Sequence, residues 1–83
     1  MKIQLKVNDA AKTLARYHVE AGDGAKGKAL RIEAQKNVRY ELVDEQTQFA
    51  PENIATKRAG NDLHIAFEGS DIAQPDVVIK DYY

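Results

Sequence analysis

The stretch Leu63-His64-Ile65-Ala66-Phe67 decides the fold class, because large apolar residues stand at its first, third and fifth positions. Side chains of a β-strand alternate between the two faces of a sheet, so this period of two predicts a strand with a buried face. His64 is expected on the opposite face. The preceding Ala59-Gly60-Asn61-Asp62 is a turn sequence, and the strand-like residues 54–58 before it complete a hairpin.

The same alternation recurs along the rest of the chain. Residues 10–17 could also be helical, because Ala, Lys, Leu and Arg are good helix formers, but the alternation favours a strand. Residues 35–37 form a turn that predicts a second hairpin, between residues 30–34 and 38–42. The first strand, with Lys2 and Lys6 on its polar face, is expected at a sheet edge. Seven strand candidates result, at residues 3–7, 12–19, 30–34, 38–42, 54–58, 63–67 and 77–83.

These seven candidates, separated by turn signals, predict an all-β fold: a small antiparallel β-sandwich or rolled sheet of about six to seven strands. The 83 residues are expected to form a single β-rich domain, 1–83. The chain contains no cysteine, which excludes disulfides and thiol chemistry. Its net charge of −1 argues against partners that require a strongly basic protein, namely nucleic acids and anionic membranes.

The residues that could carry out catalysis are few and scattered. Ser70 is the only serine, and its Glu68-Gly69-Ser70-Asp71 context lacks the second glycine of a nucleophile elbow, so a turn serine is expected. His18 and His64 show no zinc-ligand spacing. Asp62, Asp71 and Asp76 do not form a calcium loop and are expected to be solvated. The sequence therefore predicts a protein that is not an enzyme and has no metal or other cofactor.

A glycine-rich loop at residues 22–27 partly matches a phosphate-binding loop. Lys28 follows Gly27 as the motif requires, but Ala29 stands where the motif has a magnesium-binding hydroxyl. A helix should follow such a loop, whereas residues 30–33 alternate as a strand does. We therefore expect an ordinary loop and no nucleotide site.

The hairpin at residues 54–67 and the terminal Val77-Val78-Ile79-Lys80-Asp81-Tyr82-Tyr83 together resemble the N-terminal prefix domain of large biofilm-associated (Bap-like) bacterial adhesins exported by type I secretion. Those domains tend to end in an R-x-G-N-D-L-x-I hairpin, a short turn, and an I-K-(D/N)-(F/Y)-(F/Y) strand. The positions that match here are Arg58, Gly60, Asn61, Asp62, Leu63, Ile65, Ile79, Lys80, Asp81, Tyr82 and Tyr83. This sequence departs from the pattern in its long connection at residues 68–75.

The resemblance implies a non-catalytic module of a surface adhesin that acts in anchoring, retention or adhesion during biofilm formation. It implies that the chain is the N-terminal module of a longer protein, located at the bacterial cell surface, associated with the outer membrane, or secreted. Its expected partners are the type I secretion machinery or cell-envelope components and other adhesin modules. The motif brings no catalytic residues with it, and it implies that the closing aromatic residues cap the sheet.

A second interpretation stays open. The first residues lack the apolar stretch of a secretory signal, and no segment has the length of a transmembrane helix. These features also fit a small cytoplasmic binding domain that recruits a protein partner through an exposed sheet edge.

Overall fold

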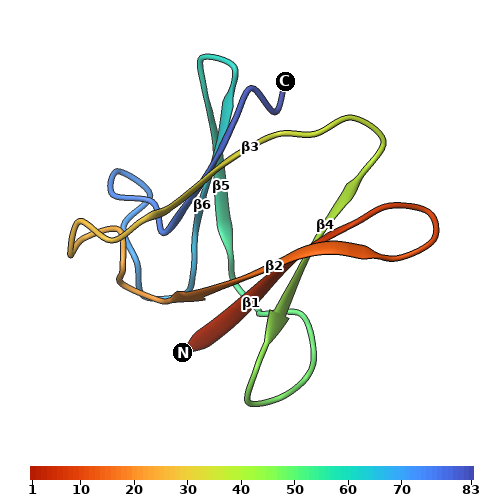
Figure 1. The fold of residues 1–83 in the computed structure, drawn as a ribbon. Helices are drawn as coiled ribbons and strands as arrows, with labels where there is room; N and C mark the ends of the chain where they lie inside the picture. Colours follow the sequence, from red (N-terminus) through yellow and green to blue (C-terminus); the bar gives the residue numbers. More distant parts are fainter.

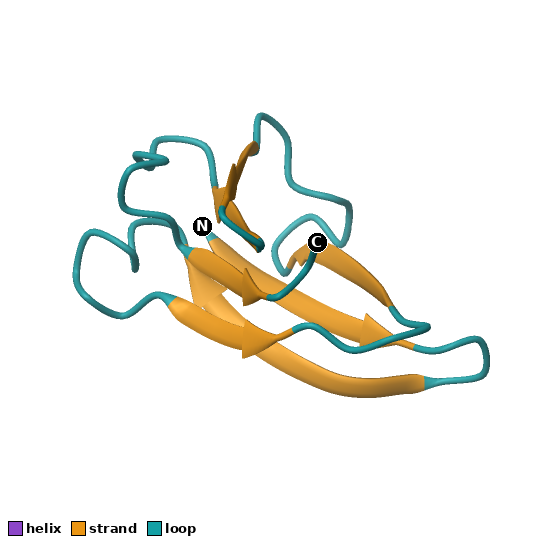
Figure 2. Cartoon of the chain, turned by 90° about the horizontal axis from the view of Figure 1, so that it is seen from above, coloured by secondary structure: helices purple, strands orange, loops and turns teal.

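The computed structural model describes residues 1–83 and contains seven strands and no helix (Figures 1 and 2). The strands are β1 (Lys2–Asn8), β2 (Thr13–Glu20), β3 (Leu30–Glu33), β4 (Arg39–Asp44), β5 (Ala55–Ala59), β6 (Asp62–Ala66) and β7 (Val77–Lys80). They form a three-stranded sheet of order β2-β1-β4 and a four-stranded sheet of order β3-β7-β6-β5. The predicted all-β fold with six to seven strands is confirmed. No helix in the structure is long and apolar enough to cross a membrane.

The two sheets pack through the faces that the period-two pattern makes apolar. Buried side chains from both sheets form one cluster, made of Ile3, Leu5, Val7, Val19, Ile32, Ile65, Phe67, Val77 and Ile79. Residues 10–17 do not form a helix: Thr13–Glu20 is a strand, as the alternation predicts. Leu14, on the other face of this strand, stays 43% exposed.

The predicted hairpin between residues 30–34 and 38–42 is wrong. β3 belongs to the four-stranded sheet and pairs in parallel with β7, whereas β4 pairs with β1 in the other sheet. The chain follows β7 to its end, where the Ala34 amide donates to the carbonyl of Lys80 at 2.8 Å. It then crosses between the sheets through a turn in which Asn37 has a φ of 61°. The short turn therefore connects two layers of the sandwich rather than two neighbours in one sheet.

The first strand is not at an edge. β1 lies at the centre of its sheet, with β2 on one side and β4 on the other, and both pairings are antiparallel. Its apolar side chains are fully covered, and Lys6 reaches across to Glu41 of β4, with 3.9 Å between Nζ and Oε1. The two lysines therefore do not protect an edge. The four edge strands are β2, β3, β4 and β5.

Candidate functional site

The two sequence segments that resemble the adhesin prefix domain meet at the turn between β5 and β6. A two-residue turn, Gly60-Asn61, joins the strands, and Gly60 has a φ of +64° while Asn61 keeps a negative φ. This combination is typical of a type II′ turn, in which the first central residue must have positive φ and is therefore glycine. Figure 1 shows this turn beside the C-terminus.

Hydrogen bonds hold the last three residues against that turn. The Oδ1 of Asp62 accepts the Asp81 amide at 2.9 Å, and the Asn61 carbonyl accepts the Tyr83 amide at 3.0 Å. The sequence predicts a last strand that continues to Tyr83, but β7 ends at Lys80. Asp81 has a φ of 58°, so the chain changes direction immediately after β7. We call this arrangement the C-terminal clasp; it consists of Arg58, Gly60, Asn61, Asp62, Asp81, Tyr82 and Tyr83.

Arg58 completes the clasp from the β5 side. Its Nε donates to the Gly60 carbonyl at 2.9 Å, and its guanidinium carbon lies 4.5 Å from the centroid of the Tyr83 ring. A guanidinium over an aromatic face at this distance makes a favourable cation–π contact. Tyr82 packs edge-on against Tyr83, with 5.0 Å between the ring centroids.

The aromatic residues extend the clasp to the other sheet. The ring of Tyr82 lies 6.0 Å from that of Tyr40 on β4, and the Tyr40 hydroxyl accepts the Gln35 amide at 2.9 Å. Tyr82 and Tyr83 remain 44% and 52% exposed. They therefore rest on the edge of the sandwich as a half-exposed cover.

The structure places the other motif residues outside the clasp. Ile65 and Ile79 are buried in the core and Leu63 packs against it, whereas the Lys80 side chain is exposed. Seven of the eleven motif residues thus share one location, and three others build the core beneath it. Hairpin turn, core strand and terminal aromatic residues form one structural unit.

Sequence reasoning missed the most deeply buried polar group, Asp76. It was expected to be a solvated loop aspartate, but its side chain has no exposed surface. Its Oδ1 accepts the amides of Gly22 and Gly24, both at 3.0 Å, and its Oδ2 accepts the Phe67 amide at 3.1 Å. Three backbone donors replace the water that the carboxylate loses on burial. One signal was present: Asp76 immediately precedes the apolar run Val77-Val78-Ile79.

The glycine-rich loop therefore does hold an anion, although not a phosphate. It wraps around the carboxylate of Asp76, and Ser70 helps, since its Oγ accepts the Gly22 amide at 3.0 Å. A Cβ at Gly24 would overlap the carbonyl oxygens of Gln74 and Pro75, so a glycine is required for this close approach. The sequence predicts an ordinary loop here, and it gives no sign that the Gly22 and Gly24 amides bind the carboxylate of Asp76.

The remaining candidate residues do not come together. His18 is an exposed strand residue whose Nδ1 lies 3.1 Å from Glu45 Oε1, and His64 is half-buried on the outer face of β6. Asp62, Asp71 and Asp76 lie in three different hydrogen-bonding environments, and no group of three or more His, Cys, Asp or Glu side chains is placed to hold a metal ion.

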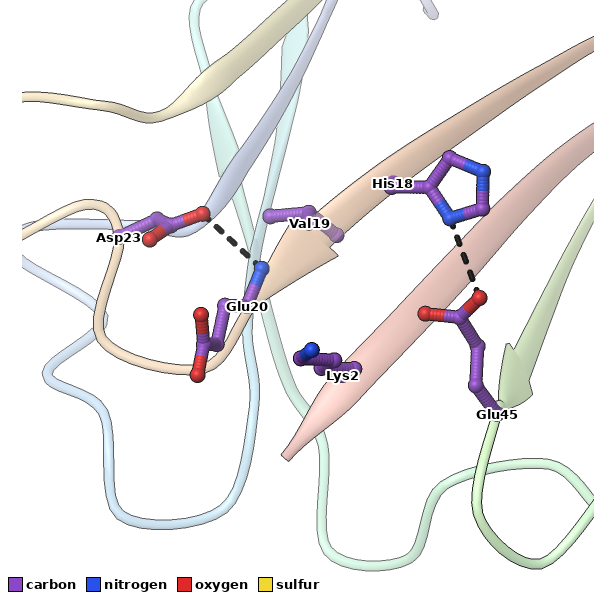
Figure 3. A pocket seen from close by; sticks show the side chains of 6 residues that line it. All are labelled: Lys2, His18, Val19, Glu20, Asp23 and Glu45. Atoms are coloured by element: carbon purple, nitrogen blue, oxygen red, sulfur yellow. Dashed lines mark hydrogen bonds and ion pairs between the residues drawn. The ribbon is translucent and has the colours of Figure 1, made fainter.

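A hollow of about 530 Å³ lies on the surface beside His18 (Figure 3). Its lining contains one apolar residue and consists of Lys2, His18, Val19, Glu20, Asp23 and Glu45. The carboxylate of Asp23 accepts the Glu20 amide at 2.9 Å, and Glu45 faces His18, so two of the three acidic groups are already engaged within the protein. The hollow is an open polar surface without a converging set of functional groups.

No family model matches this chain, and comparisons with curated proteins and with solved structures found no match. The resemblance to the adhesin prefix domain therefore depends on the motif residues alone.

Proposed function

We propose that the chain is a non-catalytic β-module of a large bacterial surface adhesin and serves in anchoring, retention or adhesion during biofilm formation. The observation that carries the proposal is the C-terminal clasp. Motif residues that lie about 20 positions apart in the sequence bind one another directly, through Asp62 to Asp81 and Asn61 to Tyr83. Because each half of the motif needs the other for these hydrogen bonds, we expect both halves to occur together in adhesin domains of this kind.

The clasp also gives the motif a mechanical role that suits an adhesin. The terminal segment is tied to the β5–β6 turn by hydrogen bonds and by the Arg58–Tyr83 contact, and to the other sheet by the Tyr82–Tyr40 contact. Tension applied at the C-terminus would be distributed over both sheets rather than peeling β7 away from β6. In this role the partners are the type I secretion machinery or cell-envelope components and other adhesin modules, and the location is the cell surface.

The first test is the reading frame of the gene. We expect the reading frame to continue beyond the codon of Tyr83 into an array of adhesin repeats. A stop codon directly after Tyr83 would contradict the proposal. The second test deletes the codons of residues 1–83 and measures biofilm mass and the amount of adhesin retained on the cells. Retention or biofilm mass is expected to fall, while transcription of the gene stays unchanged.

A matched pair of point variants refines the second test. Arg58→Ala removes the contact with Tyr83 and the hydrogen bond to Gly60, whereas Lys26→Ala removes a positive charge from an exposed loop outside the motif. Only the Arg58 variant should reduce retention under shear flow. Equal retention of both variants would show that the clasp does not contribute to retention of the adhesin on the cells.

A further inference from the structure

The outer edge of β5 has a free backbone. β5 is the last strand of its sheet, and its residues make no backbone hydrogen bond outside the ladder with β6. The four residues Ala55–Arg58 are exposed. No loop covers this edge and no side chain bonds to its main chain, so it can accept a further strand.

The pairing pattern identifies which groups point outward. The carbonyls of Asp76 and Lys80 accept amides from β3, so alternate β7 residues, Val77 and Ile79, bond to β6. The same alternation across β6 directs residues 55, 57 and 59 of β5 toward β6. The amides and carbonyls of Thr56 and Arg58 therefore face away from the sheet, and they offer two donors and two acceptors to an added strand.

The charge of this edge is all of one sign. β5 carries Lys57 and Arg58 and no acidic residue, whereas each of the other three edge strands carries both signs. These mixed pairs are Arg16 and Glu20 on β2, Arg31 and Glu33 on β3, and Arg39 and Glu41 on β4. The two salt bridges of the structure are Lys6–Glu41 and His18–Glu45, so neither cation of β5 has an acidic partner.

A second copy of the chain fits this edge poorly. An antiparallel pair of β5 strands that used both Thr56 and Arg58 would be centred on Lys57, with each Lys57 directly opposite its equivalent. Like charges at directly opposed positions destabilise a strand pair. An added strand with acidic side chains would instead place a carboxylate opposite Lys57, on one face, and opposite Arg58, on the other.

We propose that the outer edge of β5 binds an extended acidic peptide segment by strand addition, through the backbone groups of Thr56 and Arg58 and the charges of Lys57 and Arg58. The segment becomes a fifth strand of the four-stranded sheet. This is the mode in which main-chain bonds give affinity and side chains give specificity. The inference does not require the adhesin assignment, and it gives a location and a ligand chemistry to the alternative of a partner-binding sheet edge.

The test uses two blocked seven-residue peptides of alternating Thr and Val, one with two adjacent central positions occupied by glutamate and the other by lysine. Binding to the isotope-labelled protein is followed by NMR. The glutamate peptide should shift the amide signals of Thr56 and Arg58 and slow their hydrogen exchange. The lysine peptide should bind at least about tenfold more weakly, because two cross-strand charge pairs change from attractive to repulsive. Added salt should weaken the glutamate peptide's binding.

Two variants separate the backbone contribution from the charge contribution. Thr56→Pro removes an outward amide while leaving the ladder with β6 intact, so glutamate-peptide binding should fall by about tenfold or more. Lys57→Glu keeps the strand and should reverse the preference between the peptides. Lys26→Glu makes the same charge change on an exposed loop and should leave the preference unchanged.

Three results would overturn the proposal. They are the failure of the glutamate peptide to bind, equal binding of both peptides, and a shift pattern confined to residues outside β5. Sedimentation of the unliganded protein gives a further check, because a self-dimer that Thr56→Pro abolishes would assign the edge to a second copy. If Thr56→Pro does not fold, the Lys57→Glu preference decides.

Discussion

Asp76 places a carboxylate in the interior with no cation beside it. Neither salt bridge of the structure involves it, and its charge is met by the amides of Gly22, Gly24 and Phe67 alone. Its backbone is engaged as well, since its amide donates to Ile65 and its carbonyl accepts the amide of Leu30. One residue therefore connects the glycine-rich loop, β6 and β3.

Asp76→Ala is expected to lower the free energy of unfolding by about 3 kcal/mol or more, because each buried donor left without a partner costs about 1–3 kcal/mol. Asp71→Ala is the matched control in the same connection: Asp71 is exposed and accepts one local amide, so its loss should cost less than about 1 kcal/mol. Urea denaturation of both variants measures the difference. Similar costs for the two would show that Asp76 does not fix the loops.

Asp9 makes the stability depend on pH through the turn between β1 and β2. The amides of Ala11 and then Lys12 donate to its carboxylate and lower the pKa of Asp9 below its ordinary value of 3.8. A lowered folded-state pKa means that the ionised form is favoured in the folded protein. The contribution of the Asp9 charge to folding stability is fully present at pH values above the ordinary pKa, and it is lost as the pH falls through the lowered pKa of the folded protein.

The measurement compares the wild type with Asp9→Asn, which keeps an acceptor oxygen but cannot ionise. The wild type should be the more stable of the two at about pH 6, and the difference should shrink steadily as the pH falls below about 4. Thermal unfolding across this range follows the difference directly. A difference that does not change with pH would contradict the role of the Asp9 charge.

At the scale of the element, β6 directs Leu63 and Ile65 toward the core and His64 to the outer face of its sheet. Ile65 is 4% exposed within the core, and Leu63 packs partly buried beside it. Ile65→Ala should lower the free energy of unfolding by about 2–5 kcal/mol, and Leu63→Ala should fall at the lower end of that range because less of it is covered. His64→Ala, in the same strand but on the outer face, should be close to neutral. Chemical denaturation of the three variants gives the order, and a costly His64→Ala would show that the half-buried imidazole contributes to the packing around Val78, which is buried on the same face.

At the scale of the whole molecule, the sequence predicts where the strands lie along the chain better than it predicts which strands are neighbours in a sheet. The period-two alternation identifies strands with one buried face, such as β1, because every second side chain of such a strand is buried. It does not describe the burial of β5, whose first four residues are all exposed, or of β7, whose first three residues are all buried. It does not record which sheet a strand joins. The turn at residues 35–37 has the length of a hairpin turn, yet the chain crosses from β3 to β4 in the opposite layer, because β3 bonds to the distant β7. The central position of β1 in its sheet could not be predicted either, because the alternation does not show which strands lie on its two sides.

The same distinction between local signals and long-range contacts applies to the candidate site. The residues of the clasp could be identified from the motif, because the hairpin turn has a local sequence signal, but the hydrogen bonds from Asp81 and Tyr83 back to that turn could not be predicted. The binding of the Asp76 carboxylate by the glycine-rich loop could not be predicted either, since Asp76 and Gly24 are 52 residues apart and their contact depends on the folded loops. Long-range polar contacts of this kind leave no periodic trace in a sequence.

The clasp predicts that the C-terminus and the sandwich unfold together. Asp62→Ala removes the acceptor of the Asp81 amide, so the last residues should detach from the β5–β6 turn at a cost of about 1 kcal/mol, the usual contribution of one such hydrogen bond. Asn61→Ala is the control, because Asn61 holds Tyr83 through its backbone carbonyl and the substitution leaves that carbonyl in place. Hydrogen exchange of the Asp81 and Tyr83 amides should accelerate in the Asp62 variant and stay slow in the Asn61 variant. Equal protection in both would mean that the aromatic contacts of Tyr82 and Tyr83 hold the terminus without the turn, and that the motif's aspartate acts only within the hairpin.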